Sequence, residues 1–114
     1  TVANFLRLVD QHYFDGNRWF RVVPNGYAQA GDKSGTGTGG PGWTIRDEVN
    51  RERFVMPMLG MARPGADMGG SQWFINLTTL PDRDGDYTVF GRVTGSYNGL
   101  ARVAQGDVIR SIHR

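Results

Sequence analysis

The sequence predicts a mainly β protein, an antiparallel barrel or sandwich capped by two α-helices. Three observations indicate this class. Glycine contributes 17 of the 114 residues, about twice its usual share of about 7%. Short runs rich in β-branched and aromatic residues recur between turn residues. Only two segments, one near each end of the chain, have the spacing of an amphipathic helix.

The composition indicates one soluble domain that spans residues 1–114. No stretch approaches the roughly 18 apolar residues of a membrane span. Thr1 begins directly in a helical pattern with no signal peptide before it, so we expect either that a leader was removed or that the chain is part of a longer one. The absence of cysteine excludes disulfides and thiolate catalysis, and it leaves the cellular compartment open. The net charge of +2 comes from basic residues scattered among acidic ones, so nucleic-acid binding is not expected.

The first part of the chain predicts a helix followed by a β-hairpin. Apolar residues recur with helical spacing over residues 2–13, with Thr1 as the N-cap. A strand is predicted at residues 18–24, a tight turn at Asn25-Gly26, and a second strand at residues 27–31.

Two loops resemble ligand-binding motifs but do not meet their structural requirements. The glycine-rich segment 33–42 contains a formal G-x-G-x-x-G pattern, but Pro41-Gly42 prevents a helix from starting after it, so nucleotide binding is not expected. The acidic turn at residues 82–86 has Val93 where a calcium-binding loop requires a bidentate glutamate.

The second part of the chain predicts further strands. Residues 54–61 contain Pro57 and therefore predict an edge or irregular strand. In the strand predicted at residues 71–77, alternation places on one face Gln72, Phe74 and Asn76, and on the other Trp73, Ile75 and Leu77. One face therefore combines amide and aromatic groups.

The last part of the chain predicts a strand, a helix and a final strand. Residues 87–93 are rich in β-branched and aromatic residues. A short amphipathic helix around residues 100–104 is closed by Gly106, and a last strand is predicted at residues 108–112. The expected total is two helices and about six strands.

Arg21 is the first candidate functional residue, because it interrupts an apolar strand. By alternation it shares a face with Trp19 and Val23. A guanidinium is unfavourable there unless a partner or a ligand satisfies its five donors. The alternative is an arginine at the rim of the sheet, whose stem covers apolar surface while its charged end stays in water.

The other residue types in the sequence limit the kinds of functional site that the chain can form. His12 and His113 lie near opposite ends of the sequence, and no serine lies in a nucleophile elbow. No metal site, cofactor site or hydrolytic constellation is therefore expected. The remaining candidates provide one cation, two amides and an apolar patch, namely Arg21, Gln29, Met61, Gln72 and Phe74. Such a site binds a substrate without attacking it.

Several motifs together resemble the cyclophilin family of peptidyl-prolyl cis-trans isomerases. They are, in order, T-V-A-N-F-L, F-R-V-V-P followed by Q-A-G-D, G-T-G-T-G-G-P-G, G-M-A, G-G-S-Q-W-F-I, D-G-D-Y-T-V-F-G-R-V and Q-G-D-V-I. The resemblance covers nearly the whole chain. It implies an eight-stranded antiparallel barrel capped by two helices, of which this chain lacks the opening N-terminal β-hairpin. We expect that the chain is a fragment, that a partner pairs with its edges, or that it closes a smaller barrel.

The resemblance also implies roles for individual residues. Arg21 matches the family's catalytic arginine, Gln29 and Gln72 its substrate-binding glutamines, Met61 and Ala62 its groove wall, and Phe74 the floor of its proline pocket. Substitutions relative to the family occur at further positions expected to face the substrate, namely Arg63, Arg83 and Tyr87. Tyr27 is expected to face the substrate as well, where it can turn to fill the pocket wall beside Gly26. Gly26 replaces a phenylalanine of the pocket wall, and Phe20 replaces a histidine.

The function implied by the resemblance is acceleration of X-Pro bond rotation in proline-containing polypeptides during protein folding. It requires no cofactor or metal, and the family also binds cyclosporin-type ligands. The alternative is a non-catalytic module, which binds peptides or serves as a structural part of a larger assembly. The altered pocket and the absent hairpin motivate this alternative.

Overall fold

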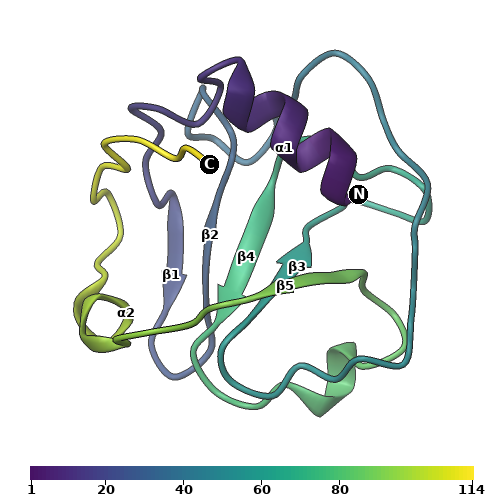
Figure 1. The fold of residues 1–114 in the computed structure, drawn as a ribbon, viewed down its shortest axis with the longest axis vertical. Helices are drawn as coiled ribbons and strands as arrows, with labels where there is room; N and C mark the ends of the chain where they lie inside the picture. The colour runs from purple at the N-terminus through teal and green to yellow at the C-terminus, as the bar shows by residue number, and fades with distance from the viewer.

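The computed structural model describes residues 1–114 as a five-stranded antiparallel sheet with two α-helices (Figure 1). The strands lie side by side in the order β1-β2-β4-β3-β5. The elements are, in chain order, α1 (Val2–Asp10), β1 (Arg21–Val23), β2 (Tyr27–Ala30), β3 (Met58–Met61), β4 (Trp73–Asn76), a 3₁₀ turn η1 (Pro81–Arg83), β5 (Val89–Arg92) and α2 (Asn98–Arg102).

The strand register aligns residues of one face across four strands. Arg21 pairs with Gln29, Gln29 pairs with Phe74, and Phe74 pairs with Gly60. Directly paired residues in an antiparallel sheet point to the same face. The sheet therefore brings Arg21, Gln29 and Phe74 into one row, although they are far apart in the sequence.

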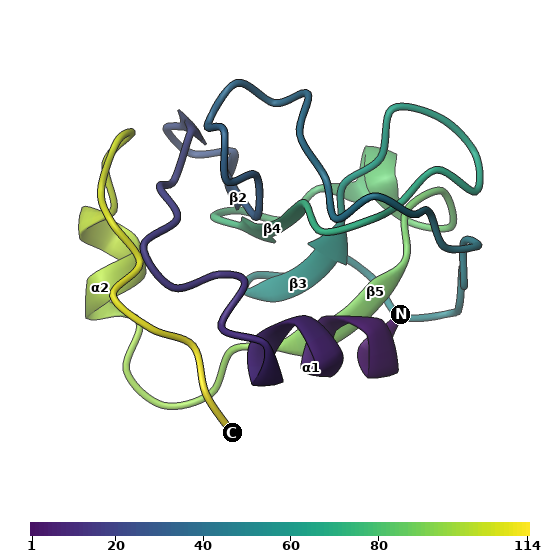
Figure 2. The ribbon, with the colours of Figure 1, turned by 90° about the horizontal axis from the view of Figure 1, so that it is seen from above.

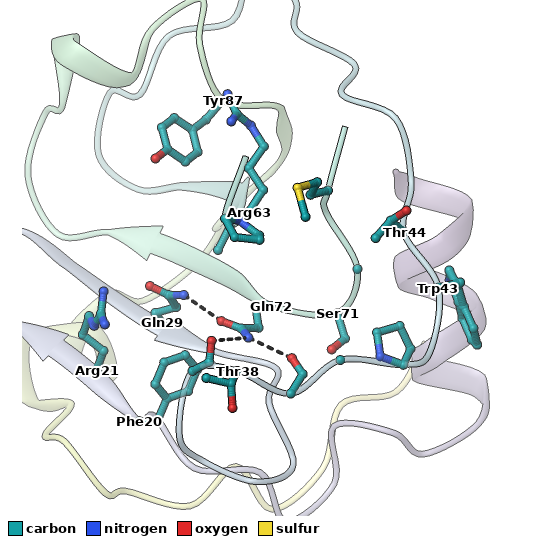
Figure 3. A pocket seen from close by; sticks show the side chains of 18 of the residues that line it. Phe20, Arg21, Gln29, Thr38, Trp43, Thr44, Arg63, Ser71, Gln72 and Tyr87 are labelled. Atoms are coloured by element: carbon teal, nitrogen blue, oxygen red, sulfur yellow. Dashed lines mark hydrogen bonds between the residues drawn. The ribbon is translucent and has the colours of Figure 1, made fainter. Parts of the chain in front are cut away.

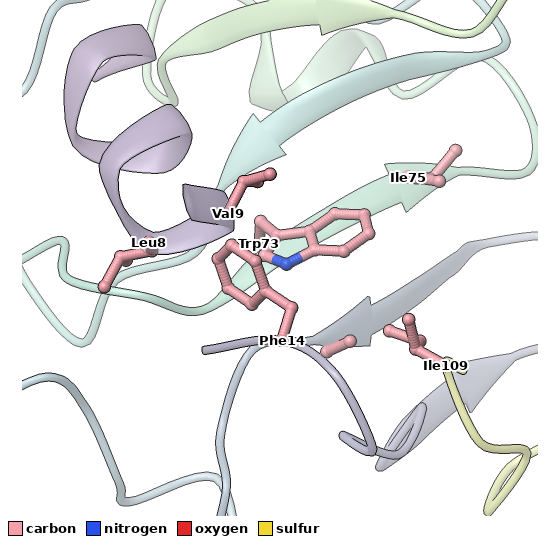
Figure 4. Packing of buried hydrophobic residues seen from close by; sticks show 7 residues of the cluster. Leu8, Val9, Phe14, Trp73, Ile75 and Ile109 are labelled. Carbon is pink, nitrogen blue, oxygen red and sulfur yellow. The ribbon is translucent and has the colours of Figure 1, made fainter. Parts of the chain in front are cut away.

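One face of the sheet packs against α1. Leu8 and Val9 of this helix are buried, and they pack with Trp73 of β4 (Figure 4). The Trp73 ring lies 5.1 Å from the Trp19 ring and 5.7 Å from the Phe5 ring, between centroids. Figure 2 shows α1 on one side of the sheet and the long loop that follows β2 on the other.

The opposite face carries a second apolar cluster, which includes Phe54, Met58, Ala62, Phe74 and Val89. Because β4 is central and both its faces are covered, all four of its residues are buried. The face assignment predicted from alternation is confirmed, since alternate residues of β4 join different clusters.

A fully buried amide, that of Asn76, fixes the segment before β3 against β4. Its Oδ1 accepts from the backbone N–H of Met58 at 2.7 Å, and its Nδ2 donates to the carbonyl oxygens of Phe54 at 3.0 Å and Thr78 at 2.7 Å. These bonds satisfy the buried amide and hold Phe54 over the sheet.

The predicted barrel is not present as a closed sheet, and the structure has five strands instead of about six. β1 and β5 are the two edge strands of the sheet. The strand predicted at residues 108–112 is wrong, because that segment makes only an isolated bridge between Val108 and Arg18. Two backbone hydrogen bonds, from Gly16 N–H to Ile109 O and from Ile109 N–H to Asn17 O, connect this segment to residues 16 and 17. The strand predicted from residue 18 begins only at Arg21.

Other boundaries also differ from the prediction. Of the two alternatives predicted from Pro57, the edge position is wrong because β3 lies between β4 and β5, and the irregular strand is confirmed by a register shift between Leu59 and Gly60. Pro57 itself precedes the paired residues. α1 ends at Asp10, because residues 11–16 form turns. None of the helices has the length and apolar character that a membrane crossing requires.

Gly60 is required where β3 passes the aromatic rings of the second cluster. A Cβ atom at this position would collide with the Phe74 ring and lie 2.7 Å from Cε1 of Phe54. The absence of a side chain on Gly60 therefore leaves the space that Phe74 occupies.

We expect Gly60→Ala to lower the free energy of unfolding by about 1–3 kcal/mol, because overpacking forces buried rings out of their positions. Urea unfolding followed by circular dichroism measures this. Gly40→Ala is the control, since a Cβ there meets no atom within 4 Å and the residue lies outside the helices and strands. Equal stability of Gly60→Ala and the wild type would contradict the prediction.

Candidate active site

A cavity of about 600 Å³ lies beside the amide pair of β2 and β4 (Figure 3). Segments from five parts of the chain form its walls: β1, β2, the glycine-rich loop, the loop around Ala62–Ser71 and the turn that contains Arg83. Of the residues predicted for the site, those that line the cavity are Arg21, Tyr27, Gln29, Ala62, Arg63, Gln72, Arg83 and Tyr87. Met61 and Phe74 are buried beneath it.

Sequence reasoning missed part of the lining. Thr38, Trp43, Thr44, Pro64 and Met68 also face the cavity. They belong to loops whose path depends on tertiary hydrogen bonds. The glycine-rich composition of residues 33–42 predicts a loop, but it does not predict that the loop lies against the cavity.

The two predicted glutamines form one hydrogen-bonded unit. Gln29 Nε2 donates to Gln72 Oε1 at 3.1 Å, and Gln72 Nε2 donates to the carbonyl oxygens of Gly37 at 3.0 Å and Gly39 at 2.9 Å. Figure 3 shows this chain of hydrogen bonds along the wall of the cavity. Gln72 is thereby fixed, whereas the Oε1 atom of Gln29 has no protein donor and can accept a hydrogen bond from a ligand.

The glycine-rich loop is held by the buried carboxylate of Asp32. It accepts from Ser34 N–H at 2.8 Å, Ser34 Oγ at 2.6 Å, Gly37 N–H at 2.7 Å and Gly39 N–H at 3.0 Å. Burial alone would raise the pKa of Asp32, but these hydrogen bonds outweigh burial and lower the pKa to about 2. The ionised carboxylate therefore fixes the loop whose carbonyl groups orient Gln72.

Arg21 is exposed at the start of β1, and its guanidinium has no hydrogen bond or ion pair within the chain. The alternation predicted from Trp19 is wrong, because Trp19 packs edge-on against Trp73 in the core while Phe20 and Arg21 both line the cavity. The reason is that the strand begins only at Arg21. Its five donors are available to a ligand in the cavity.

Arg63 differs from Arg21 because its charge is neutralised within the protein. Its Nε lies 3.3 Å from Asp47 Oδ1, and its Nη2 lies 3.1 Å from Asp86 Oδ1. Its side chain is 13% exposed. Arg63 therefore connects three segments at the cavity wall and contributes little free positive charge.

Arg83 packs over aromatic rings. Its Cζ lies 4.4 Å from the centroid of Tyr27, 4.7 Å from that of Phe74 and 4.9 Å from that of Tyr87. These are cation–π distances. The Tyr27 ring itself meets Phe74 edge-on at 6.1 Å, so a tyrosine forms a wall beside the position of Gly26.

The cavity can bind an extended chain by its backbone and can place a cation beside it. No group of three or more histidine, aspartate or glutamate side chains is arranged to hold a metal ion. No nucleophile with an adjacent base lies at the cavity. The chemistry available is hydrogen bonding and electrostatic stabilisation.

Comparisons with known proteins identify the family to which this chain belongs. The sequence model of the cyclophilin type peptidyl-prolyl cis-trans isomerases matches residues 1–112. Peptidyl-prolyl cis-trans isomerase B of Bacillus subtilis is 41% identical over 98% of this chain and 80% of its own length. A peptidyl-prolyl cis-trans isomerase of Helicobacter pylori is 41% identical over 98% of this chain and 71% of its own length.

A solved structure is similar as well. The crystal structure of a Cryptosporidium parvum cyclophilin type peptidyl-prolyl cis-trans isomerase, in the presence of the dipeptide Ala-Pro, superposes with a TM-score of 0.88 at 26% identity. The match covers 96% of this chain and 81% of that one. The chain belongs to the family of cyclophilin-type peptidyl-prolyl cis-trans isomerases, and its activity is the cis–trans isomerisation of peptidyl-prolyl bonds.

We expect Asp32→Asn to lower the free energy of unfolding near neutral pH by about 2 kcal/mol, because the folded carboxyl has a pKa of about 2 instead of 3.8. A lowered folded-state pKa stabilises the fold above pH 3.8, and this contribution is lost as the pH falls from about 4 to 2. Urea unfolding at a series of pH values measures it.

The free energies of unfolding of the wild type and of Asp32→Asn should therefore become more similar as the pH falls from about 4 to 2. Glu52→Gln is the control for loss of an exposed carboxylate elsewhere on the chain, because the Glu52 carboxylate makes no ion pair. A difference between the wild type and Asp32→Asn that stays constant from pH 6 to pH 2 would contradict the prediction.

Proposed function

We propose that Arg21 is the catalytic residue of this isomerase and that the cavity binds X-Pro segments of polypeptides during folding. The observation that supports this most directly is the row formed by Arg21, Gln29 and Phe74 across three paired strands, with the Arg21 donors free. The unit that carries the function is the whole of residues 1–114.

The reaction needs a group that favours a twisted amide. Resonance gives a peptide bond a rotational barrier of about 18–20 kcal/mol, and X-Pro isomerisation takes tens to hundreds of seconds without a catalyst. Twisting localises the lone pair on the prolyl nitrogen. Arg21 donates a hydrogen bond to that nitrogen and to the adjacent carbonyl group, and it therefore stabilises the transition state more than the planar ground state.

The remaining residues hold the substrate. Gln29 accepts from a substrate backbone N–H through its free Oε1, and Gln72 keeps Gln29 in position. Phe74 forms the floor beneath the prolyl ring. The walls are formed by Ala62, Tyr27, Arg63, Arg83 and Tyr87, and Met61 supports them from beneath. The Ala-Pro dipeptide used with the Cryptosporidium parvum relative is consistent with recognition of this kind of ligand.

A second candidate, a module that binds proline segments without accelerating their rotation, is supported by the altered aromatic pocket. Tyrosine and arginine side chains surround Phe74. Two-dimensional NMR exchange spectroscopy on a proline peptide separates the two functions. Accelerated cis–trans exchange supports the enzyme, whereas line broadening without accelerated exchange supports the binding module.

We expect Arg21→Ala to reduce kcat/KM for a proline peptide about 100-fold, the size of effect that follows removal of one transition-state donor. The fold should be unchanged, because the Arg21 side chain is exposed and makes no ion pair. A coupled or NMR isomerisation assay measures the rate. Arg18→Ala, which removes a nearby exposed cation outside the cavity, is the matched control and should retain activity. Full activity of Arg21→Ala would eliminate the assignment.

A further inference from the structure

Arg83 is placed unusually for an arginine without an anionic partner. No carboxylate lies within ion-pair distance of it, and no hydrogen bond anchors its guanidinium. A guanidinium that is withdrawn from water needs compensation. Here the compensation comes from the three rings of Tyr27, Phe74 and Tyr87, all within 5 Å of its Cζ.

The Phe74 ring is fully covered by its neighbours, and its exposed fraction is 0%. Its neighbours Tyr27 and Tyr87 meet it edge-on, at 6.1 Å and 5.8 Å. Phe54 lies at 5.3 Å with a tilted ring. Arg83 covers further surface of the Phe74 ring, so no ligand can reach this ring while Arg83 stays in place.

From this geometry we infer that Arg83 occupies the position that a prolyl ring takes over Phe74, and that substrate binding displaces it. The inference rests on the proposed role of Phe74 as the floor of the proline pocket. Arg83 is then a specificity-determining residue, because only segments whose proline competes with the guanidinium for the aromatic rings enter the pocket.

Displacement requires little rearrangement. Arg83 is the last residue of η1, and its backbone N–H bonds to the carbonyl oxygen of Leu80 independently of the side chain. Because no polar contact holds the guanidinium, rotation about side-chain bonds is sufficient to move it into solvent. Arg63, with its two aspartate partners, has no comparable freedom.

Competition of this kind lowers the apparent affinity for substrate. If the pocket is open in about one molecule in ten, the apparent Kd is raised about tenfold over that of an open pocket. Removing the Arg83 side chain should lower the apparent Kd by the same factor. A residue that only forms a wall would have the opposite effect, because its removal takes contacts away from the bound ring.

The first test compares the affinity of wild type and Arg83→Ala for acetyl-Ala-Ala-Pro-Phe-amide, an uncharged peptide whose binding does not depend directly on the lost charge. NMR titration should give a Kd about tenfold lower for Arg83→Ala. Arg51→Ala removes an exposed cation outside the cavity and should leave the Kd unchanged. An unchanged or higher Kd for Arg83→Ala overturns the inference.

The second test uses the wild-type chain alone. Side-chain protons of Arg83 that lie over aromatic rings should have resonances shifted upfield in the free protein, and saturation with the peptide should remove that shift. Upfield shifts that persist at saturation overturn the inference even if Arg83→Ala fails to fold.

The isomerisation rate of the wild type separates the two proposals. An active wild type whose Arg83→Ala variant binds no more tightly overturns the Arg83 inference and leaves the proposed function intact. A wild type that neither binds nor isomerises the peptide overturns the proposed function and, with it, the role of Arg83.

Discussion

The buried carboxylate of Asp32 is the interaction on which the geometry of the cavity depends. A glycine-rich loop loses much conformational entropy when it is ordered, so this loop needs specific interactions to hold it. Asp32 gathers the backbone N–H groups of Gly37 and Gly39, so that the carbonyl groups of the same residues point to Gln72. Gln72 in turn holds Gln29. A side chain that never contacts the substrate therefore sets the position of one that is proposed to bind it.

The residues that meet on strands could be predicted from the sequence, because strand periodicity determines which face a side chain occupies. Alternation in β4 correctly separated Phe74 from Trp73. The predicted turn at Asn25-Gly26 brings Arg21 opposite Gln29. These assignments need only local geometry and a two-residue period. The same reasoning predicted both helices, although α1 is shorter than its apolar pattern and α2 lies two residues earlier than predicted, so that Val103 and Ala104 follow it.

What the sequence did not predict depends on long-range partners. Residues 108–112 have strand-like composition, but strand pairing needs a neighbour, and residues 16–19 provide only a few hydrogen bonds. The positions of Thr38 and Trp43 follow from the loop fixed by Asp32. The position of Arg83 over Phe74 follows from the meeting of three separate segments at one ring. No periodicity encodes such contacts.

The different environments of three arginines at the cavity have a kinetic consequence. Asp47 and Asp86 neutralise Arg63, but no carboxylate balances Arg21 or Arg83. The cavity therefore carries an excess of positive potential, which attracts anionic chain segments over distances comparable to the Debye length of about 8 Å at physiological salt. Acidic regions of an unfolded polypeptide should encounter the enzyme faster than basic ones, and added salt should remove the difference. Ionic strength thus becomes a determinant of which chains this enzyme meets first.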